Sequence, residues 1–369
     1  MKRLSFVGIL FITLLLSCST EDDVNGGGGD QSGFDRKVLL ENVADNIAIP
    51  AYENLAARLN SLQSSTTAFT TTVSVENLTS LRTSWKQAYV SWQAISFLEI
   101  GKAEEISFRN FMNVYPVTVA DIEANISSGS YDLSLVSKQD EQGFAAIDYL
   151  LNGIGTTDEE VVAVFNEPTT GANYRQYLTD VVARMVQLTD VVVSDWKGAY
   201  RDNFVNNSGS SATSSFDKLV NDYLFHYEKH LRAGKIGIPA GAFNNVPLED
   251  RVEAYYDGEF SKTLFLANLN AMQDFFNGKH FDAATNGESF KTYLEYLNRN
   301  DLSTLINDQF DIIRLESAEL DDNFSAQVRT NNTLMLQTFD NLQANVVLLK
   351  VDMLSAFSVS VDFIDADGD

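Results

Sequence analysis

Apolar side chains recur at intervals of three and four residues along much of the chain, which is the spacing of one face of an α-helix. The pattern is longest over 78–95, 178–192 and 335–356. Its apolar positions are Leu78, Leu81, Trp85, Ala88, Trp92 and Ile95, then Leu178, Val181, Met185, Leu188 and Val192, then Met335, Phe339, Leu342, Val346, Leu349, Met353 and Ala356. Shorter helices are predicted at 38–62, 143–152, 249–277, 289–298 and 302–321. No clear alternation of apolar and polar residues between hairpin turns is present, so the pattern predicts an all-α fold.

Long amphipathic helices joined by short polar links pack as up-and-down bundles. The stretch least suited to a helix is 203–215, which is rich in Asn, Ser and Gly and has the composition of a loop. It divides the chain into halves of similar size, which predicts two packed up-and-down bundles, 34–202 and 213–358. Pro50 is expected to bend or end the first helix, because proline removes a backbone donor.

The N-terminus has the features of a secretory signal, with two early cations before a short apolar run at 4–16. The sequence Leu-Leu-Ser-Cys that follows, ending at Cys18, resembles the lipobox of bacterial lipoproteins. Residues 1–17 are therefore predicted to be a lipoprotein signal peptide, and Cys18 to be lipid-modified after cleavage. An ordinary signal peptide with a chance cysteine, or a short uncleaved anchor, are the alternatives.

The residues after Cys18 indicate a tether and a location. The stretch 18–33 contains an acidic cluster at 21–23 and four consecutive glycines, a composition typical of a flexible linker. The acidic cluster resembles the surface-export signal of Bacteroidetes lipoproteins. We therefore expect an outer-membrane lipoprotein that is held by its lipid anchor and exposed on the cell surface, with a periplasm-facing body as the alternative. The last residues, 359–369, are predicted to be a solvated acidic tail.

Composition excludes several classes of function. The chain of 369 residues has 26 basic and 51 acidic side chains, a net charge of −25 and a pI near 4.4, so no nucleic-acid partner is expected. A single cysteine excludes disulfides within the chain and cysteine cages for zinc or iron–sulfur clusters. With 44% hydrophobic and 21% charged residues the composition is that of a globular protein.

The segment 142–153, Gln-Gly-Phe-Ala-Ala-Ile-Asp-Tyr-Leu-Leu-Asn-Gly, resembles the signature of the imelysin-like proteins. The family pattern is Gly-x-His-x-x-Glu followed by Tyr/Phe-Leu-Leu-x-Gly. The histidine position holds Ala145 here and the glutamate position holds Asp148, whereas Gly143, Ile147, Leu150, Leu151 and Gly153 fit.

Two further segments carry the same resemblance. Trp85, Ala88, Trp92 and Gly101 are similar to the tryptophan-containing helix of the first bundle in that family. Where many members have an arginine and an acid on that helix, this chain has Tyr89 and Ser96. The stretch 231–239, with Arg232 and Lys235, is similar to a segment of Bacteroidetes members. The resemblance covers most of 34–358 and implies a fold of two helical bundles.

The resemblance also implies a function in iron uptake, since members look like lipoproteins or periplasmic proteins of that process, although the family takes its name from a peptidase assignment. The residues it places in a ligand-binding cleft are Asp148, Tyr89, Ser96, Arg232 and Lys235. Because Ala145 supplies no donor atom, the paired histidine and carboxylate that could bind one metal are lost. Asp148 could still be a ligand, or be a satisfied polar residue in a relic cleft.

A second candidate for metal binding is the pair His226 and His230, whose i, i+4 spacing on a helix suits zinc or copper. Glu228 stands two residues after His226, so the arrangement is not that of the His-Glu-x-x-His zinc proteases. The alternative is that both histidines are hydrogen-bonded residues on a bundle seam.

Three hypotheses follow. The first is a non-catalytic ligand-binding lipoprotein that works with iron- or haem-uptake partners. The second is a metallopeptidase that uses His226 and His230 with an unidentified carboxylate. The third is a structural lipoprotein that recruits a partner protein or envelope polymer through its acidic surface. Iron, haem and zinc are the candidate ligands, and the residues do not choose among them.

Overall fold

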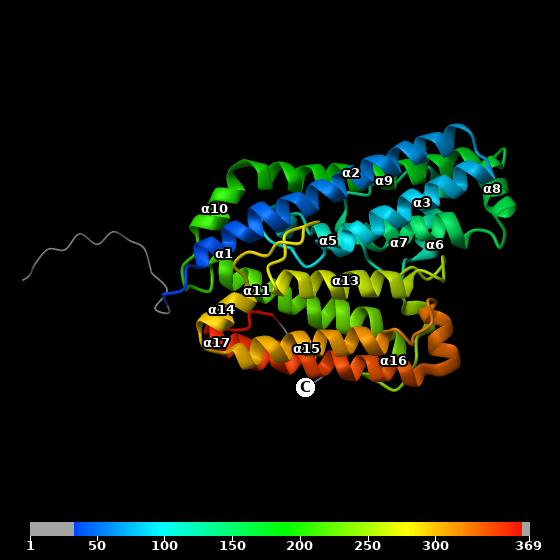
Figure 1. Ribbon diagram of the computed structural model, residues 1–369. Helices are drawn as coiled ribbons and strands as arrows, with labels where there is room; N and C mark the ends of the chain where they lie inside the picture. Colours follow the sequence, from blue (N-terminus) through cyan, green and yellow to red (C-terminus); the bar gives the residue numbers. More distant parts are fainter. Residues whose placement is uncertain (1–32, 364–369) are drawn as a thin grey trace, which may run out of the picture.

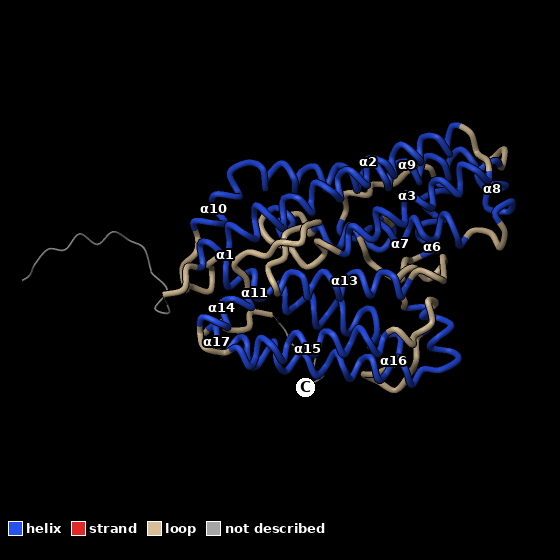
Figure 2. The backbone as a smooth tube through the Cα atoms, in the orientation of Figure 1, coloured by secondary structure: helices blue, strands red, loops and turns tan. Residues whose placement is uncertain are grey.

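The computed structural model describes residues 33–363. The predicted signal peptide, Cys18, most of the predicted tether and the end of the acidic tail lie outside this range. Within it the chain forms helices and loops without a strand, arranged as two packed layers of helices (Figures 1 and 2). The predicted all-α fold is confirmed.

The first layer, drawn at the top of Figure 1, contains the helices up to residue 206. In chain order, with η marking 3-10 and π segments, these are α1 (Arg36–Asn42), η1 (Val43–Ala48), α2 (Ile49–Thr71), α3 (Val75–Gln93), α4 (Lys102–Glu105), α5 (Phe108–Met112), α6 (Val119–Ser128), η2 (Val136–Glu141), α7 (Gly143–Asp148), η3 (Tyr149–Gly153), α8 (Asp158–Asn166), α9 (Gly171–Asp195), η4 (Trp196–Tyr200) and α10 (Arg201–Asn206).

The second layer contains the helices from residue 215 onward. These are α11 (Ser215–Phe225), η5 (His226–Gly237), α12 (Ile238–Ala240), η6 (Glu249–Arg251), α13 (Ser261–Phe276), α14 (Phe290–Tyr296), α15 (Asn300–Ser317), α16 (Phe324–Val346), η7 (Val347–Met353) and α17 (Leu354–Phe357). The loop between the layers falls inside the predicted 203–215 stretch, and the domain boundaries 34–202 and 213–358 stay a prediction.

The predicted apolar stripes form the core of these helices. The stripe of α3 is buried throughout, including the two tryptophans Trp85 and Trp92. The Trp85 indole nitrogen donates a hydrogen bond to the Phe144 carbonyl, so the first bundle's central helix is fixed against α7. Replacing either tryptophan by alanine is expected to lower the free energy of unfolding by about 3–5 kcal/mol, the usual range for a buried aromatic side chain. None of the helices among residues 33–363 has the length and apolar character needed to cross a membrane.

One prediction about helix bounds is wrong and another stays a prediction. The first predicted helix changes from α to π over Val43–Ala48, and α2 begins at Ile49 with helical backbone continuing across Pro50, so the bend expected at Pro50 stays a prediction. The predicted helix 249–277 is helical only from Ser261. Residues 249–260 form a 3-10 turn and irregular turns, with Ala254 and Gly258 both at positive φ. We call residues 249–260 the wall segment, because they form one side of the cavity described below.

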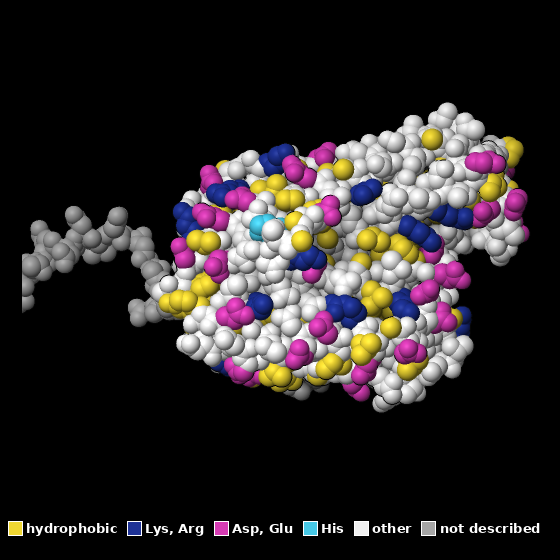
Figure 3. Space-filling view, viewed as in Figure 1, with side chains coloured by type: hydrophobic (Ala, Val, Ile, Leu, Met, Phe, Trp, Pro, Cys, Tyr) yellow, Lys and Arg dark blue, Asp and Glu magenta, His cyan; other side chains and the backbone are white. Residues whose placement is uncertain are grey.

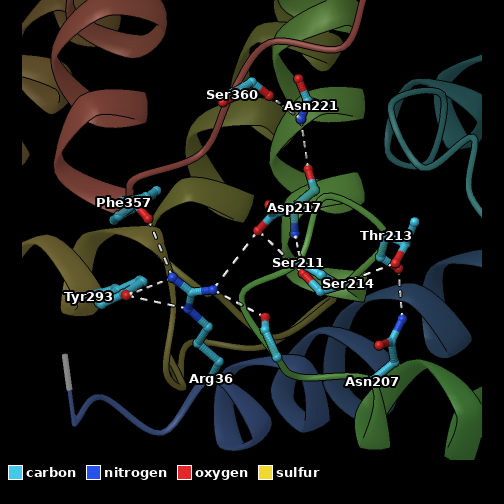
Figure 4. Close-up of polar contacts among 11 residues, drawn as sticks. Arg36, Asn207, Ser211, Thr213, Ser214, Asp217, Asn221, Tyr293, Phe357 and Ser360 are labelled. Carbon is cyan, nitrogen blue, oxygen red and sulfur yellow. Dashed lines mark hydrogen bonds and ion pairs between the residues drawn. The ribbon is translucent and has the colours of Figure 1, made fainter. Parts of the chain in front are cut away.

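The buried Arg36 at the start of α1 connects the first layer to the second (Figure 4). Its guanidinium donates to the Tyr293 hydroxyl at 3.0 Å and to the Phe357 carbonyl at 3.3 Å, and lies 3.9 Å from the Asp217 carboxylate. These partners belong to α14, α17 and α11. One buried cation therefore joins the beginning of the chain to three helices of the second layer.

Candidate functional site

The motif segment α7–η3 lies beside a cavity of about 590 Å³ with several polar side chains in its lining. Gly143 opens this segment at φ +78°, and a Cβ there would lie 2.3 Å from the Met112 carbonyl oxygen, so only glycine fits. Gly153 closes it against the ring of Tyr256. The cavity is lined by Val114, Tyr115, Pro116, Val117, Thr118, Asp140, Ala145, Asp148, Asp250, Arg251, Val252, Ala254, Tyr255 and Tyr256.

Asp148 lines this cavity, and its carboxylate already accepts hydrogen bonds from the protein. It is 1% exposed and accepts hydrogen bonds from the backbone N–H groups of Tyr256 and Asp257, both at 2.9 Å. The Asn152 side chain donates a third, also at 2.9 Å. Burial raises the pKa of Asp148 to about 7, although its hydrogen bonds act in the opposite direction. The carboxylate therefore holds the wall segment in place.

Glu253 is the second anchor of the wall segment, and the sequence did not reveal it. It is 2% exposed and forms a buried ion pair with Lys235. Its other oxygen accepts from Gln93 at 3.1 Å and from Asn113 at 2.7 Å. Burial lowers the pKa of the Lys235 ammonium, and the Glu253 carboxylate opposes that shift.

Tyr89 belongs to the same network, because its hydroxyl donates to the Asn113 side-chain oxygen at 2.6 Å. Its ring stacks on Phe144 of α7, with centroids 4.4 Å apart. Burial raises the pKa of Tyr89 well above its usual value, so the phenol stays protonated. The structure thus joins two predicted cleft residues, Tyr89 and Lys235, through Asn113 and Glu253.

Ser96 and the two histidines lie around a much smaller cavity, about 20 Å³. Tyr115 lines this cavity and the first one. The Asn268 amide nitrogen donates to Ser96 Oγ at 3.1 Å, so its oxygen accepts from His226 Nε2 at 2.9 Å. The small cavity has room for about one water molecule.

The His226 and His230 rings are stacked with centroids 5.2 Å apart. Burial lowers the pKa of both, and the nearby charges of Arg109 and Lys235 act in the same direction. Residues 33–363 contain no group of three or more His, Cys, Asp or Glu side chains placed to hold a metal ion. Metal binding by this pair stays a prediction, and neighbouring cations oppose it.

Arg232 lies apart from the other predicted cleft residues. Its guanidinium stands 5.2 Å from the ring centroid of Phe339 and donates to the Gln343 side chain. It lines neither cavity. Of the five predicted residues, Asp148 faces the large cavity, Tyr89, Ser96 and Lys235 lie in the buried network behind it, and Arg232 packs elsewhere.

The site does not fit a metal held by the family's paired motif. Ala145 lines the cavity with a methyl group, and both oxygens of Asp148 are occupied by N–H donors of the wall segment. The carboxylates around the cavity, those of Asp140, Asp148 and Asp250, form no group suited to an ion within the described chain. What remains is a cavity whose polar lining includes carboxylates, phenols, the Thr118 side chain and one guanidinium.

Comparison with known proteins places this architecture in a family. The imelysin family model matches residues 48–348, and the chain belongs to that family. A solved structure from Parabacteroides distasonis ATCC 8503, described as an iron-regulated protein A precursor, has a TM-score of 0.71 and 16% identity over 90% of this chain and 97% of its own. An imelysin-like protein from Psychrobacter arcticum 273-4 has a TM-score of 0.69 and 16% identity over 92% and 100%. Among curated proteins none matches the chain.

Proposed function

We propose that this imelysin-family protein is a non-catalytic outer-membrane lipoprotein that binds an organic, iron-bearing ligand in the cavity beside Asp148. Haem and a ferric chelate are the two ligands of that kind to test. The observation that carries the proposal is the cavity itself: about 590 Å³, built on the family motif, with Asp148 used to position the wall segment. That volume lies within the range of about 300–1,000 Å³ that small-molecule sites occupy.

Three features favour a whole chelate over a bare ion. The carboxylates around the cavity are not gathered into a metal-binding group among the described residues. Tyr115, Tyr255 and Tyr256 line the cavity and offer aromatic surface for stacking. The guanidinium of Arg251 offers a partner for an anionic group of the ligand. The iron role itself is supported by the printed description of the Parabacteroides structure and by the sequence resemblance.

The lipid anchor at Cys18 is supported by the lipobox-like sequence and by the Gly-rich residues after it. An anchored body exposed on the cell surface would hold its ligand close to iron- or haem-uptake partners in the same membrane. The test of the anchor is metabolic labelling with a radiolabelled fatty acid in the native host. Label on the wild-type protein and none on C18S supports it, and equal label on both contradicts it.

The ligand is tested by titrating the full chain with haem, with ferric citrate and with Fe(II) alone, each followed by absorbance and calorimetry. We expect one equivalent of haem or of the chelate, and no saturable binding of Fe(II). Asp148→Asn keeps the side-chain volume but replaces one acceptor oxygen with a donor that faces backbone N–H groups. We therefore expect about tenfold weaker binding for that variant. Saturable Fe(II) binding that Asp148→Asn abolishes would contradict the proposal.

A peptidase assay on unfolded protein substrates tests the metallopeptidase alternative directly. Turnover that His226→Ala or His230→Ala abolishes would contradict a non-catalytic role. If neither haem, chelate nor turnover is seen, the remaining hypothesis is a structural interaction lipoprotein. That hypothesis predicts a protein or polymer partner whose binding weakens as salt increases.

A further inference from the structure

A second groove lies on the seam between the two layers. It consists of two adjoining cavities of about 430 Å³ and 620 Å³ that share Val90, Ala94 and Phe281. The larger cavity also has Asp274, Lys279 and Asp282 in its lining, with Lys279 and Asp274 paired at 2.8 Å, so the proposal below concerns the smaller cavity and the shared residues. In Figure 3 apolar side chains and basic side chains lie next to each other between the two layers. We call this feature the seam groove.

The groove is built by α2, α3, α13 and the loop that carries Phe281, and some of its apolar residues are left partly open. Val90 of α3 is 37% exposed, although α3 buries its main stripe elsewhere. Small residues of α13, Ala267 and Ala271, form the opposite wall. The loop that carries Phe281 is fixed, because the Phe281 N–H donates to the Asn46 carbonyl at 2.7 Å. The groove is therefore a formed feature of the fold, and its walls can accept an apolar chain.

The charges around the smaller cavity are the reverse of those in the whole protein. The chain has 51 acidic and 26 basic residues, yet the described lining of this cavity includes Arg58 and Lys86 and no carboxylate. Lys86 is neutralised by Asp257 at 2.8 Å. Arg58 donates to the Gln87 side-chain oxygen at 3.3 Å and forms no ion pair with a carboxylate in the described part of the chain. One cation is thus available at the mouth of an apolar groove.

We propose that the seam groove binds a single-chain amphiphile with a carboxylate head. The alkyl chain lies along Val90, Ala94 and Phe281, and the carboxylate meets the guanidinium of Arg58. Arg58 can supply paired N–H donors to a carboxylate, and the apolar walls recognise the length of the chain. The proposal does not depend on the ligand proposed for the cavity beside Asp148, although Phe260 of the wall segment lines the smaller cavity.

The test is calorimetric titration of the full chain carrying C18S, purified without detergent, with octanoate, decanoate and dodecanoate below their micelle-forming concentrations. Each additional buried CH₂ raises affinity by up to about fourfold, so the series is expected to tighten with length. Dodecyltrimethylammonium, with the same chain and the opposite charge, is expected to bind at least about tenfold more weakly than dodecanoate.

Two matched pairs of variants locate the site. R58E and K37E each replace an exposed helical cation with an acid, and only Arg58 lines the groove. V90Q and V191Q each replace a partly exposed valine, at 37% and 42% exposure. We expect about tenfold loss of dodecanoate affinity for R58E and for V90Q, and less than twofold change for the two controls.

The proposal is overturned if the two head groups bind equally, if R58E behaves like K37E, or if no member of the series binds. Binding to phosphatidylglycerol vesicles without binding of monomeric dodecanoate would also overturn it, since the site would then recognise a membrane surface. The circular dichroism spectrum and thermal unfolding of R58E serve as a check on the fold and are expected to match those of wild type.

Discussion

The cavity beside Asp148 and the seam groove differ in how their polar groups are satisfied. Around the cavity, each anchoring carboxylate already has donors within the protein: backbone amides for Asp148, and Lys235, Gln93 and Asn113 for Glu253. Along the groove, apolar side chains remain exposed and Arg58 has no carboxylate partner among residues 33–363. The anchoring groups of the first region are used within the protein to hold the wall segment, whereas the second region leaves apolar side chains and one cation exposed for a ligand.

The largest expected effect concerns the buried pair. Glu253→Ala leaves the Lys235 ammonium without its partner in an apolar interior, so we expect the free energy of unfolding to fall by about 3–5 kcal/mol. Glu295→Ala, which removes the exposed Lys291 pair, is the matched control and is expected to cost about 0–1 kcal/mol. Urea denaturation of both variants measures the difference. Equal losses would show that the wall segment is not held by this pair.

A smaller loss is expected from the motif glycine. Gly143→Ala introduces a Cβ at φ +78° and 2.3 Å from the Met112 carbonyl oxygen, which we expect to cost about 2–4 kcal/mol. Gly129 also has positive φ, at +63°, but only the Asn173 side chain lies near it, at 3.8 Å. Gly129→Ala is therefore expected to cost about 1–2 kcal/mol, the backbone contribution alone. Thermal unfolding that ranks Gly129→Ala as the worse variant would contradict the steric account.

The next effect is a pH dependence of the free energy of unfolding that comes from Asp148. The pKa of Asp148 rises from its ordinary 3.8 to about 7 in the fold, so the folded state binds a proton more tightly than the unfolded state. Between these two values Asp148 adds stability as pH falls and removes it as pH rises, by at most about 1.4 kcal/mol per pH unit. Asp148→Asn is expected to lack this contribution. The quantity to measure is the difference in unfolding free energy between the two proteins at pH 4.5, 5.5, 6.5 and 7.5, since Glu99, whose pKa is also raised to about 7, cancels in it. A difference independent of pH would contradict the account.

The smallest effect separates the groove from the cavity. Val90→Gln is expected to change the free energy of unfolding by less than about 0.5 kcal/mol, because the replaced side chain is partly exposed and contributes little to the core. Chemical denaturation alongside Val191→Gln provides the comparison. A loss of several kcal/mol would show that Val90 belongs to the structural core and that the groove is not a free surface.

The helices were predicted best where the apolar spacing within a single helix determines which of its side chains are buried. The stripe of α3 needs only its own 3,4 spacing to place Trp85 and Trp92 inside, and it does so. The wall segment was predicted as helix because its apolar and acidic residues also have helical spacing. There the tertiary contacts of Glu253 and the backbone donors to Asp148 prevail over local propensity.

The candidate site could be predicted in part. Asp148 was found because the motif marks it, and Lys235 and Tyr89 because the resemblance extends to their helices. Glu253, which pairs with Lys235 and is linked to Tyr89 through Asn113, could not be found, since nothing in the sequence distinguishes it from the other acids of the wall segment. The role predicted for Arg232 stays a prediction, and in the structure its guanidinium lies over the Phe339 ring, on the π segment η5 that also carries Lys235.

One measurement tests the central claim, that the cavity on the family motif is the ligand site. Haem is titrated into three proteins: wild type, Val117→Trp and Val90→Trp. Val117→Trp places a large side chain in the cavity beside Asp148, and Val90→Trp places one in the seam groove. Circular dichroism first shows that all three proteins fold. We expect saturable haem binding by wild type and Val90→Trp, and a haem affinity at least about tenfold lower for Val117→Trp. If ferric citrate is the ligand, its affinities follow the same order. Equal binding by Val117→Trp and wild type would contradict the claim.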